Sequence, residues 1–440
     1  MKKLKFSSLH TFDKYLVIII CVLVALRIAI LPLSPPGFYM DESAGSAHVA
    51  SMVQHGTNAF GQPWPLFSTA LGGGYTTPVY LYPATAWSSV FGFSPLSLRF
   101  FSEVMTLAAI AFIAFAMRLW TNRRTALIAA CVGLALPWGW LQGSLVWDPA
   151  LVPFFVGLAF LAFSQLLFTK SVRTKYLALF LLPLSLILLA YLYPPLRVSA
   201  PILFVAAYIL LYKRQIIHWP TLILTILGSA VISLPLLHFM QDPESLARSQ
   251  NLLVFSQMPL LPATGTFLLN MLQLVSPWFL FVTGDPNLRH STFFEGMLGI
   301  AAVPAIVAVI MMVIKYWKKS RRDLLLVWIA LFGIVVSLAG SALTAEGQPH
   351  SLRATAAWPF FVILLALGWQ WIFAQKNKKY IKISVALFVI GTLSYAAELA
   401  FVYPQYGSGA FDKPIYEKAI QHQPTPDYPG LSLQYYDALR

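Results

Sequence analysis

The sequence from Tyr15 to Gly56, YLVIIICVLVALRIAILPLSPPGFYMDESAGSAHVASMVQHG, joins a long apolar run to two adjacent carboxylates, Asp41 and Glu42. Only 10% of the 440 residues are charged, so an acidic pair directly beyond an apolar run needs a physical reason. The pair can cap the helix that follows, because carboxylates interact favourably with the free N–H groups of a first turn. It can also supply acid–base chemistry to an enzyme that works on lipid-borne substrates. We expect it to do both.

Similar apolar runs recur along nearly the whole chain. Hydrophobic residues make up 58% of the sequence, which exceeds the share in soluble globular domains. The runs are roughly 18 to 22 residues long, enough for a helix to cross a bilayer. Because the backbone must satisfy its own polar groups inside lipid, runs of this length indicate helices and not barrel strands. The sequence therefore predicts an all-α, polytopic transmembrane protein.

The formal net charge of +14 raises the question of nucleic acid binding, but the basic residues gather between the apolar runs. These clusters are Lys2, Lys3, Lys5 and Lys14; Arg123 and Arg124; Lys170, Arg173 and Lys175; Lys213 and Arg214; Lys315, Lys318, Lys319, Arg321 and Arg322; and Lys376, Lys378, Lys379 and Lys382. Under the positive-inside rule each cluster marks a cytoplasmic loop. We therefore interpret the charge as a topology signal and expect no nucleic acid partner.

Eleven spans with the N-terminus inside place all six basic regions on the cytoplasmic side. The predicted spans are 15–33, 96–120, 124–141, 149–168, 175–193, 196–212, 217–237, 294–314, 323–343, 354–374 and 381–402. They define a transmembrane domain over 1–402 and a short outer tail over 403–440. Large outer loops are predicted at 34–95 and 238–293. Residues 78–94 are expected to form an interfacial helix on the membrane, with a further span as the alternative.

This topology brings most of the remaining ionisable residues to the outer face. They are Asp41, Glu42, His48, Asp148, Arg248, Asp285, Arg289, Glu346, His350 and Arg353. Charges inside the predicted spans are interpreted as structural, because intramembrane charges usually face a partner. Among these, Arg99 and Glu103 stand four apart on one helix face and are predicted to pair with each other.

Asp148 opens an apolar run in SLVWDPALVPFF. Aspartate followed by proline is a strong N-cap pattern. The functional alternative is an acidic group that returns to the face of Asp41, where two acidic loops hold an acceptor, a sugar or a metal ion.

His350 and Arg353, in AEGQPHSLRATAAWPFF, lie at the outer mouth of a predicted span. A guanidinium suits bidentate binding of phosphate, although an arginine that snorkels to the interface is the structural alternative. Arg248 and Arg289 are further candidates for phosphate contact, and solvated loop charges are the alternative for both.

Seven motifs follow one another in a characteristic order. The Asp41-Glu42 pair is followed by GQPWPLF and TPVYLYPATAWSSVFG, then by a span that opens SLRFFSEVMTL. WDPALVPFF, YLYPPLRVSAP and EGQPHSLRATAAWPFF come later. Together these motifs resemble the GT-C superfamily of membrane glycosyltransferases, in particular the protein O-mannosyltransferase and lipid A aminoarabinose-transferase-like branch.

The resemblance implies an inverting glycosyltransferase, hexosyl or pentosyl, that takes its sugar from a polyprenyl-phosphate donor. It implies Asp41 as the essential carboxylate, Glu42 beside it as a residue that shapes the sugar or acceptor site, and Asp148 as the second acidic position. Arg353 would contact the donor phosphate. Arginine, or a bound divalent metal ion, would meet the charge of the leaving phosphate, while a carboxylate on the far side takes the acceptor's proton. We expect Asp41 to face a lipid-accessible cavity.

The sugar and the need for a metal ion stay open, and the acceptor hydroxyl could belong to a glycan, a lipid or a protein. The implied location is the plasma (cytoplasmic) membrane, with the active site on the extracytoplasmic side. A transporter or flippase of lipid-linked sugars is the leading alternative, although transporters more often place polar groups in the middle of the membrane. A cell-surface polysaccharide polymerase or ligase is the second alternative.

Overall fold

The computed structural model describes residues 11–70, 74–318, 322–345 and 347–411. Within these ranges the regular secondary structure is helical apart from one small antiparallel hairpin, β1 (Ser68–Ala70) with β2 (Gly74–Thr76). The predicted all-α class is therefore confirmed. Most of the predicted tail 403–440, most of the N-terminal basic cluster, and Glu346 lie outside the described residues.

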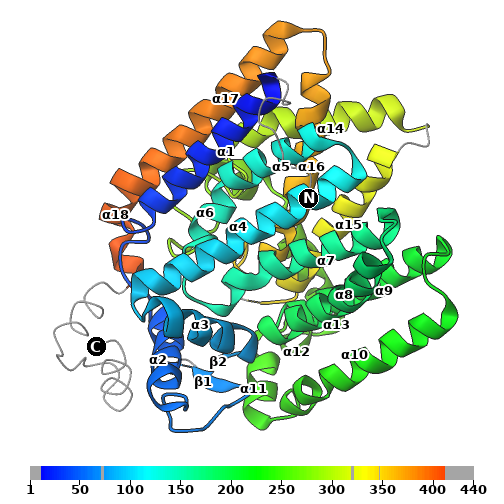
Figure 1. Ribbon diagram of the computed structural model, residues 1–440. Helices are drawn as coiled ribbons and strands as arrows, with labels where there is room; N and C mark the ends of the chain where they lie inside the picture. The colour runs from blue at the N-terminus through cyan, green and yellow to red at the C-terminus, as the bar shows by residue number, and fades with distance from the viewer. Residues whose placement is uncertain (1–10, 71–73, 319–321, 346, 412–440) are drawn as a thin grey trace.

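The first half of the chain builds the centre of a helix bundle. Its helices are α1 (Thr11–Ile30), α2 (Met40–His55), α3 (Pro78–Phe91), α4 (Pro95–Trp120), α5 (Arg123–Ala135), α6 (Pro137–Gly143), a 3-10 turn (Asp148–Leu151), α7 (Val152–Phe168), α8 (Val172–Leu192), α9 (Leu196–Lys213) and α10 (Trp219–Phe239). Helix α4 packs against α5 and α7, and α7 packs against α8, which makes these helices the core of the bundle (Figure 1).

The second half completes the bundle around this core. Its helices are α11 (Pro243–Leu252), α12 (Val254–Gln257), α13 (Leu260–Leu274), a π-helical turn (Trp278–Val282), a 3-10 turn (Ile300–Ala302), α14 (Val303–Tyr316), α15 (Arg322–Ala342), a 3-10 turn (Thr355–Ala357), α16 (Trp358–Phe373), α17 (Lys378–Ala397), a π-helical turn (Glu398–Val402), α18 (Tyr403–Tyr406) and a 3-10 turn (Ser408–Phe411). Helix α16 packs against α14, α15 and α5 and is almost fully buried.

Among the described residues, nine helices are long and apolar enough to cross a membrane, and the bent pair α5–α6 makes a tenth. The chain is therefore a multi-pass membrane protein. Each of the eleven predicted spans coincides with a helix in this structure, but α1 carries three charged residues and α14 belongs to a shorter apolar helix, Ile300–Tyr316. The count of eleven stays a prediction.

The segment 238–293, predicted as an outer loop, contains an apolar helix that the sequence prediction missed. Leu260–Val282 is 23 residues long and is one of the nine described helices that are long and apolar enough to cross a membrane. The backbone of Leu253, before it, pairs with Thr344, and the side chain of Asn270, within it, donates to the carbonyl of Thr344 at 3.0 Å. After it, Asp285 accepts from the N–H of Ser351. The segment therefore enters and leaves beside the same turn between α15 and α16.

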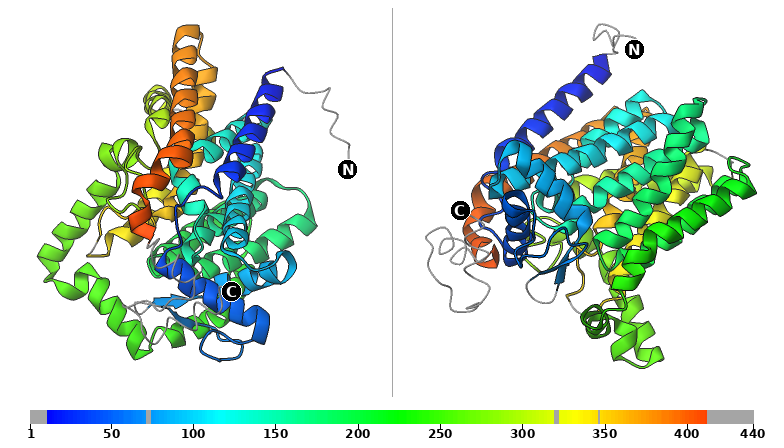
Figure 2. Two further views of the ribbon diagram at one scale, coloured as in Figure 1. Left: turned by 90° about the vertical axis from the view of Figure 1, so that its left-hand side faces the viewer. Right: turned by 60° about the horizontal axis from the view of Figure 1, so that its bottom comes forward.

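Residues 78–94 form a helix that is too short to cross the bilayer. Helix α3 has 14 residues, which gives a length of about 21 Å against a hydrocarbon core of about 30 Å. It packs against α2 and α4. Figures 1 and 2 place α2, α3 and the hairpin together at one end of the long helices. This end carries the candidate site.

Candidate functional site

Glu42 joins three parts of the chain at the start of α2. Its side chain is fully buried. One carboxylate oxygen accepts from the N–H of Val146 at 2.9 Å, and the other accepts from the N–H of Tyr39 at 2.9 Å. Burial raises the pKa of Glu42, although the Arg99 guanidinium 3.4 Å away opposes this effect. Because each of its oxygens accepts a hydrogen bond from a backbone N–H group, Glu42 has a structural role: it connects the start of α2 to the segment around Val146.

The predicted Arg99–Glu103 pair is wrong. Arg99 contacts Glu42 and donates to the backbone carbonyls of Pro35 and Gly37, so it holds the turn that precedes α2. Glu103 instead forms a buried bidentate pair with Arg27 of α1, at 2.6 and 2.8 Å. Residues four apart share a helix face only approximately, and here the two neighbours reach different helices.

Asp41 precedes Glu42 in the first turn of α2, but its side chain is exposed. Its negative charge acts on Asp148, which places the two carboxylates within electrostatic range of each other. The sequence analysis expects Asp41 to face a lipid-accessible cavity. Asp41 does not line the apolar cavity described below. The two members of the acidic pair therefore have different surroundings.

Asp148 is held by the connection between β2 and α3. One of its oxygens accepts from the backbone N–H of Thr77 at 2.8 Å and from the hydroxyl of Thr77 at 2.6 Å. The side chain is half-buried at the start of the 3-10 turn that leads into α7. This contact ties residues 71 positions apart and brings Asp148 to the end of the bundle that carries α2.

Aromatic rings connect these carboxylates to the second large loop. Trp147 contacts the ring of Tyr39 at 6.3 Å and the ring of His290 at 5.7 Å, measured between centroids. The guanidinium of Arg289 lies over the Tyr39 ring at 4.0 Å, within the range of a cation–π interaction. Arg289 therefore lies beside the residue that precedes the first turn of α2, and is half-buried there.

A second cluster brings together Asp285, His290 and His350. The Nδ1 atoms of His290 and His350 lie 3.2 and 3.7 Å from the same oxygen of Asp285, and the two imidazole rings stack with centroids 4.6 Å apart. Their potential ligand atoms all lie within 4.8 Å of one another, so the three residues could hold a metal ion. Asp285 and His290 are buried.

The predicted phosphate contacts are distributed around this cluster. Arg353 donates to the hydroxyl of Thr344 at 2.8 Å. Burial is the main cause that lowers the pKa of His350, and the charges of His290, Arg353 and Arg289 add to it. Arg289 and Arg353 therefore act on one imidazole from two loops. Arg248 belongs to α11, and its side chain lies outside the described residues.

The sequence prediction placed Asp285 on the outer face but did not assign it a role, and it did not single out His290. The pattern GDPNLRH and the separate QPH each offered potential metal ligands. Asp285 and His350 are 65 positions apart, so only the folded chain brings them together.

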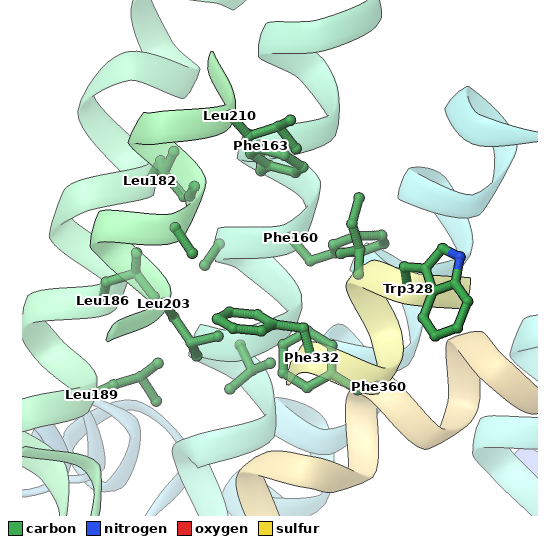
Figure 3. Close-up of a pocket in the computed structure, with 15 residues that line it drawn as sticks. Phe160, Phe163, Leu182, Leu186, Leu189, Leu203, Leu210, Trp328, Phe332 and Phe360 are labelled. Atoms are coloured by element: carbon green, nitrogen blue, oxygen red, sulfur yellow. The ribbon is translucent and has the colours of Figure 1, made fainter. Parts of the chain in front are cut away.

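An apolar cavity of about 290 Å³ lies between α7, α8, α9, α15 and α16. Figure 3 shows leucine and phenylalanine side chains from these helices turned toward one another around it. Trp328 and Phe332 line the cavity and are 45% and 44% exposed, so it opens on the outer surface of the bundle. Val156 and Leu189 place one end of it within the first turns of α7 and the last turn of α8.

No protein-family model matches this sequence, and no curated protein matches it. Solved structures are similar to it. ArnT from Cupriavidus metallidurans in the apo state has 12% identity and a TM-score of 0.56, with 96% of this chain and 84% of that chain covered. The structure of ArnT bound to undecaprenyl phosphate has 11% identity and a TM-score of 0.54, with the same coverage.

The archaeal oligosaccharyltransferase AglB from Archaeoglobus fulgidus, in complex with an inhibitory peptide and a dolichol-phosphate, has 14% identity and a TM-score of 0.54. The match covers 97% of this chain and 60% of that chain, so this chain spans less than two thirds of the AglB structure. At such identities the likeness shows the fold. The polytopic helical fold predicted from the sequence is confirmed, and this chain shares it with ArnT and AglB.

Proposed function

We propose that this chain is an inverting glycosyltransferase that moves a sugar from a polyprenyl-phosphate donor to an acceptor hydroxyl. One observation carries the proposal: at one end of an apolar bundle, Asp41 and Asp148 lie within electrostatic range of each other, and residues close to them in the chain carry the contacts of Tyr39 with Trp147 and Arg289. The fold shared with lipid-linked sugar transferases supports the same reaction class. The general activity is glycosyl transfer, and the sugar, whether a hexose or a pentose, is not defined by these residues.

We assign the donor's lipid chain to the apolar cavity. The cavity is lined by leucine, alanine and phenylalanine side chains and opens toward the surrounding hydrocarbon. Its end at Val156 lies eight residues beyond Asp148, a rise of roughly 12 Å along a helix. An isoprenoid chain bound there would place its phosphate near the carboxylates. The ArnT and AglB structures contain undecaprenyl phosphate and dolichol-phosphate, which supports a donor of this class.

The donor phosphate needs cationic partners when the glycosidic bond breaks. Arg289 and Arg353 come from separate loops and both act on His350. Planar guanidinium groups donate in pairs to phosphate oxygens, and they stabilise the negative charge that develops on the leaving group. We assign this role to Arg353 and Arg289. Arg248 stays a prediction from the sequence alone.

The acceptor hydroxyl needs a base on the face opposite the phosphate, because direct displacement inverts the anomeric carbon. We assign this role to Asp41, whose exposed carboxylate is accessible to an incoming acceptor. Asp148, held on one oxygen by Thr77, would orient the acceptor or the sugar. Glu42 acts as a positioning residue, since it fixes the first turn of α2 from which Asp41 projects.

The reaction balances without a general acid. The acceptor oxygen forms a bond to the anomeric carbon as the bond from that carbon to the phosphate oxygen breaks, and the acceptor's proton passes to Asp41. The leaving group is a lipid phosphate, whose negative charge is met by arginine and needs no proton.

We place this site on the extracytoplasmic side of the plasma membrane. The site lies at the start of α4, where Arg99 contacts Glu42, whereas the basic pair Arg123-Arg124 follows the end of α4. Helix α4 has 26 residues, a length of about 39 Å. The positive-inside rule assigns the end with the basic pair to the cytoplasm. The acceptor is therefore a glycan, a lipid or a protein outside the cytoplasm.

A donor panel tests the proposal. The purified chain is supplied with polyprenyl-phosphate sugars and a cell-envelope extract as the source of acceptor, and released polyprenyl phosphate is measured. We expect one donor to be consumed in proportion to enzyme. If no donor is consumed, while proteoliposomes containing the chain move a lipid-linked sugar across the membrane, the transporter alternative replaces the proposal.

A further inference from the structure

The strongest unassigned feature is the group Asp285, His290 and His350, of which the first two are buried and the third is partly buried. One oxygen of Asp285 lies 3.2 Å from Nδ1 of His290 and 3.7 Å from Nδ1 of His350. Four ligands placed tetrahedrally at Zn–N and Zn–O bond lengths of about 2.1 Å are separated by about 3.4 Å. The two separations from the Asp285 oxygen bracket this value, and the potential ligand atoms of all three residues lie within 4.8 Å of one another.

One ligand atom is unsatisfied without such a cation. Among the described residues, Nδ1 of His350 has no hydrogen-bond partner although it is buried. Buried polar atoms are nearly always hydrogen-bonded or bound to a metal, because desolvation without compensation is costly. In contrast, Asp285 is well supported, since it accepts from the N–H groups of Ser351 and Asn287 at 2.7 and 2.8 Å. Such supporting contacts orient metal-binding carboxylates in known sites.

The donor set favours a particular class of ion. Two imidazoles and one carboxylate suit zinc and similar borderline ions, whereas magnesium and calcium prefer oxygen ligands. Three protein ligands also leave a fourth position for water or another oxygen.

The group connects two loops that are distant in sequence. Asp285 and His290 follow the apolar helix 260–282, whereas His350 lies in the turn between α15 and α16. Arg289 is adjacent to His290, and Arg353 lies three residues after His350. A cation bound by the three residues would hold both arginine-bearing loops in one arrangement.

We propose that Asp285, His290 and His350 bind one divalent cation of the zinc class, which clamps the loops that carry Arg289 and Arg353. The role of those arginines rests on the proposed glycosyl transfer, but the metal site itself does not. The two neighbouring guanidinium groups disfavour a cation unless an anion is also present, so we expect inorganic phosphate to tighten metal binding. Binding linkage makes this effect reciprocal.

The test uses the full-length chain in detergent micelles, stripped of metal with a chelator and then titrated with Co²⁺ and Zn²⁺. The wild type should bind one ion per chain and give the visible absorption of four-coordinate Co²⁺. His350→Gln and Asp285→Asn should each lower the affinity at least tenfold. The control His55→Gln changes an exposed histidine in α2 and should bind as the wild type does.

Several outcomes would overturn the inference. Wild type that takes up no Co²⁺ in four-coordinate form removes the site, whether or not the variants fold. Equal uptake by wild type and His350→Gln would mean that the ion binds elsewhere. Asp41→Asn separates the two proposals, because it should keep one ion per chain while losing transfer. If the wild type transfers sugar but binds no metal ion, only the proposed metal site is contradicted, and the proposed glycosyl transfer stands.

Discussion

Asp41 and Glu42 are neighbours in sequence, but their side chains have different surroundings and different proposed roles. Glu42 is buried and accepts from Tyr39 and Val146, whereas Asp41 is exposed near Asp148. Successive positions on a helix point about 100° apart, so one residue of the pair faces the bundle and the other faces solvent. The sequence predicts that the pair lies at a helix start, but it does not reveal which member faces which way.

The first prediction separates these roles by stability. Glu42→Gln removes the buried anion beside Arg99 and should lower the free energy of unfolding by on the order of 3 kcal/mol, because it leaves a buried cation without its charge partner. Asp41→Asn, at an exposed position, should change it by less than about 0.5 kcal/mol. Thermal unfolding in detergent measures both. Equal destabilisation by the two variants would contradict the assignment.

The second prediction concerns the phosphate contact. Arg353→Ala should weaken donor binding roughly tenfold to a hundredfold, as expected for the loss of a charge-assisted hydrogen bond worth about 1.5–3 kcal/mol. The KM for the acceptor should change less. Arg173→Ala, at the opposite end of the bundle, is the control. Equal effects on donor and acceptor, or no effect, would remove Arg353 from the phosphate site.

The residues that sequence reasoning missed belong to contacts between distant segments. Asp285 and His350 lie 65 positions apart, and Trp147 links Tyr39 to His290 across more than two hundred positions. No local periodicity encodes such contacts. Residue type and sidedness could nominate Asp285 and His350 for the outer face, and folding was needed to place them against each other.

At the scale of elements, α1 is held to the bundle by a buried ion pair. Arg27 of α1 contacts Glu103 of α4 through two hydrogen bonds and also donates to the carbonyl of Gly139. Its guanidinium lies 5.1 Å from the ring of Trp140. The helical spacing of Arg99 and Glu103 predicted a different pair, because spacing reports neighbours within one helix and not partners between helices.

The third prediction tests this junction. Arg27→Met leaves Glu103 buried without its partner and should destabilise the protein by roughly 3–5 kcal/mol, whereas Arg27→Met combined with Glu103→Leu should recover most of that loss. The two single variants and the double variant form a cycle, measured by thermal unfolding. Additive losses in the double variant would show that the two charges do not support each other.

The helix at 260–282 lies within the segment 238–293, which the sequence predicts as an outer loop. Counting it as a span would have reversed the sidedness of every later basic cluster. The structure resolves the conflict, because both flanks of the helix contact the turn between α15 and α16. The charge pattern therefore agrees with both flanks of this segment lying on one side of the bundle, although it gave no information on the segment's helical content.

At the scale of the whole molecule, the proposed site lies at the end of the bundle where α2 and α4 begin, and the basic pair Arg123-Arg124 lies at the opposite end of α4. The fourth prediction tests this sidedness with single cysteines. An impermeant maleimide should label His55→Cys, at the end of α2, from outside intact cells. It should label Arg173→Cys only after the cells are opened. Cys21 and Cys131 are replaced by serine beforehand. Labelling of Arg173→Cys in intact cells would reverse the orientation.

The apolar cavity gives the fifth prediction. Ala207→Phe adds a ring to the cavity lining and should raise the KM for a long-chain polyprenyl-phosphate donor at least several-fold, while a short-chain donor is less affected. Leu224→Phe, on the exposed face of α10, is the control for added apolar bulk. An equal effect on long and short donors would indicate that the lipid chain binds elsewhere.

The fold could be predicted from the sequence because the length of the hydrophobic runs and the basic clusters between them are visible along the whole chain. The structures of ArnT share this polytopic helical fold. The site could be predicted only in its outline. Asp41, Asp148, Arg289 and Arg353 were nominated by type and sidedness, whereas the contacts through Thr77, Trp147 and Tyr39 depend on how the loops pack.

The most direct test of the account compares wild type with Asp41→Asn in the donor assay, with donor binding and transfer measured on the same preparations. We expect the variant to bind the polyprenyl-phosphate sugar with the affinity of the wild type and to transfer at least a hundredfold more slowly, since it lacks the base for the acceptor hydroxyl and general base catalysis contributes about 10²–10⁴-fold. Transfer by Asp41→Asn at the wild-type rate would contradict the account.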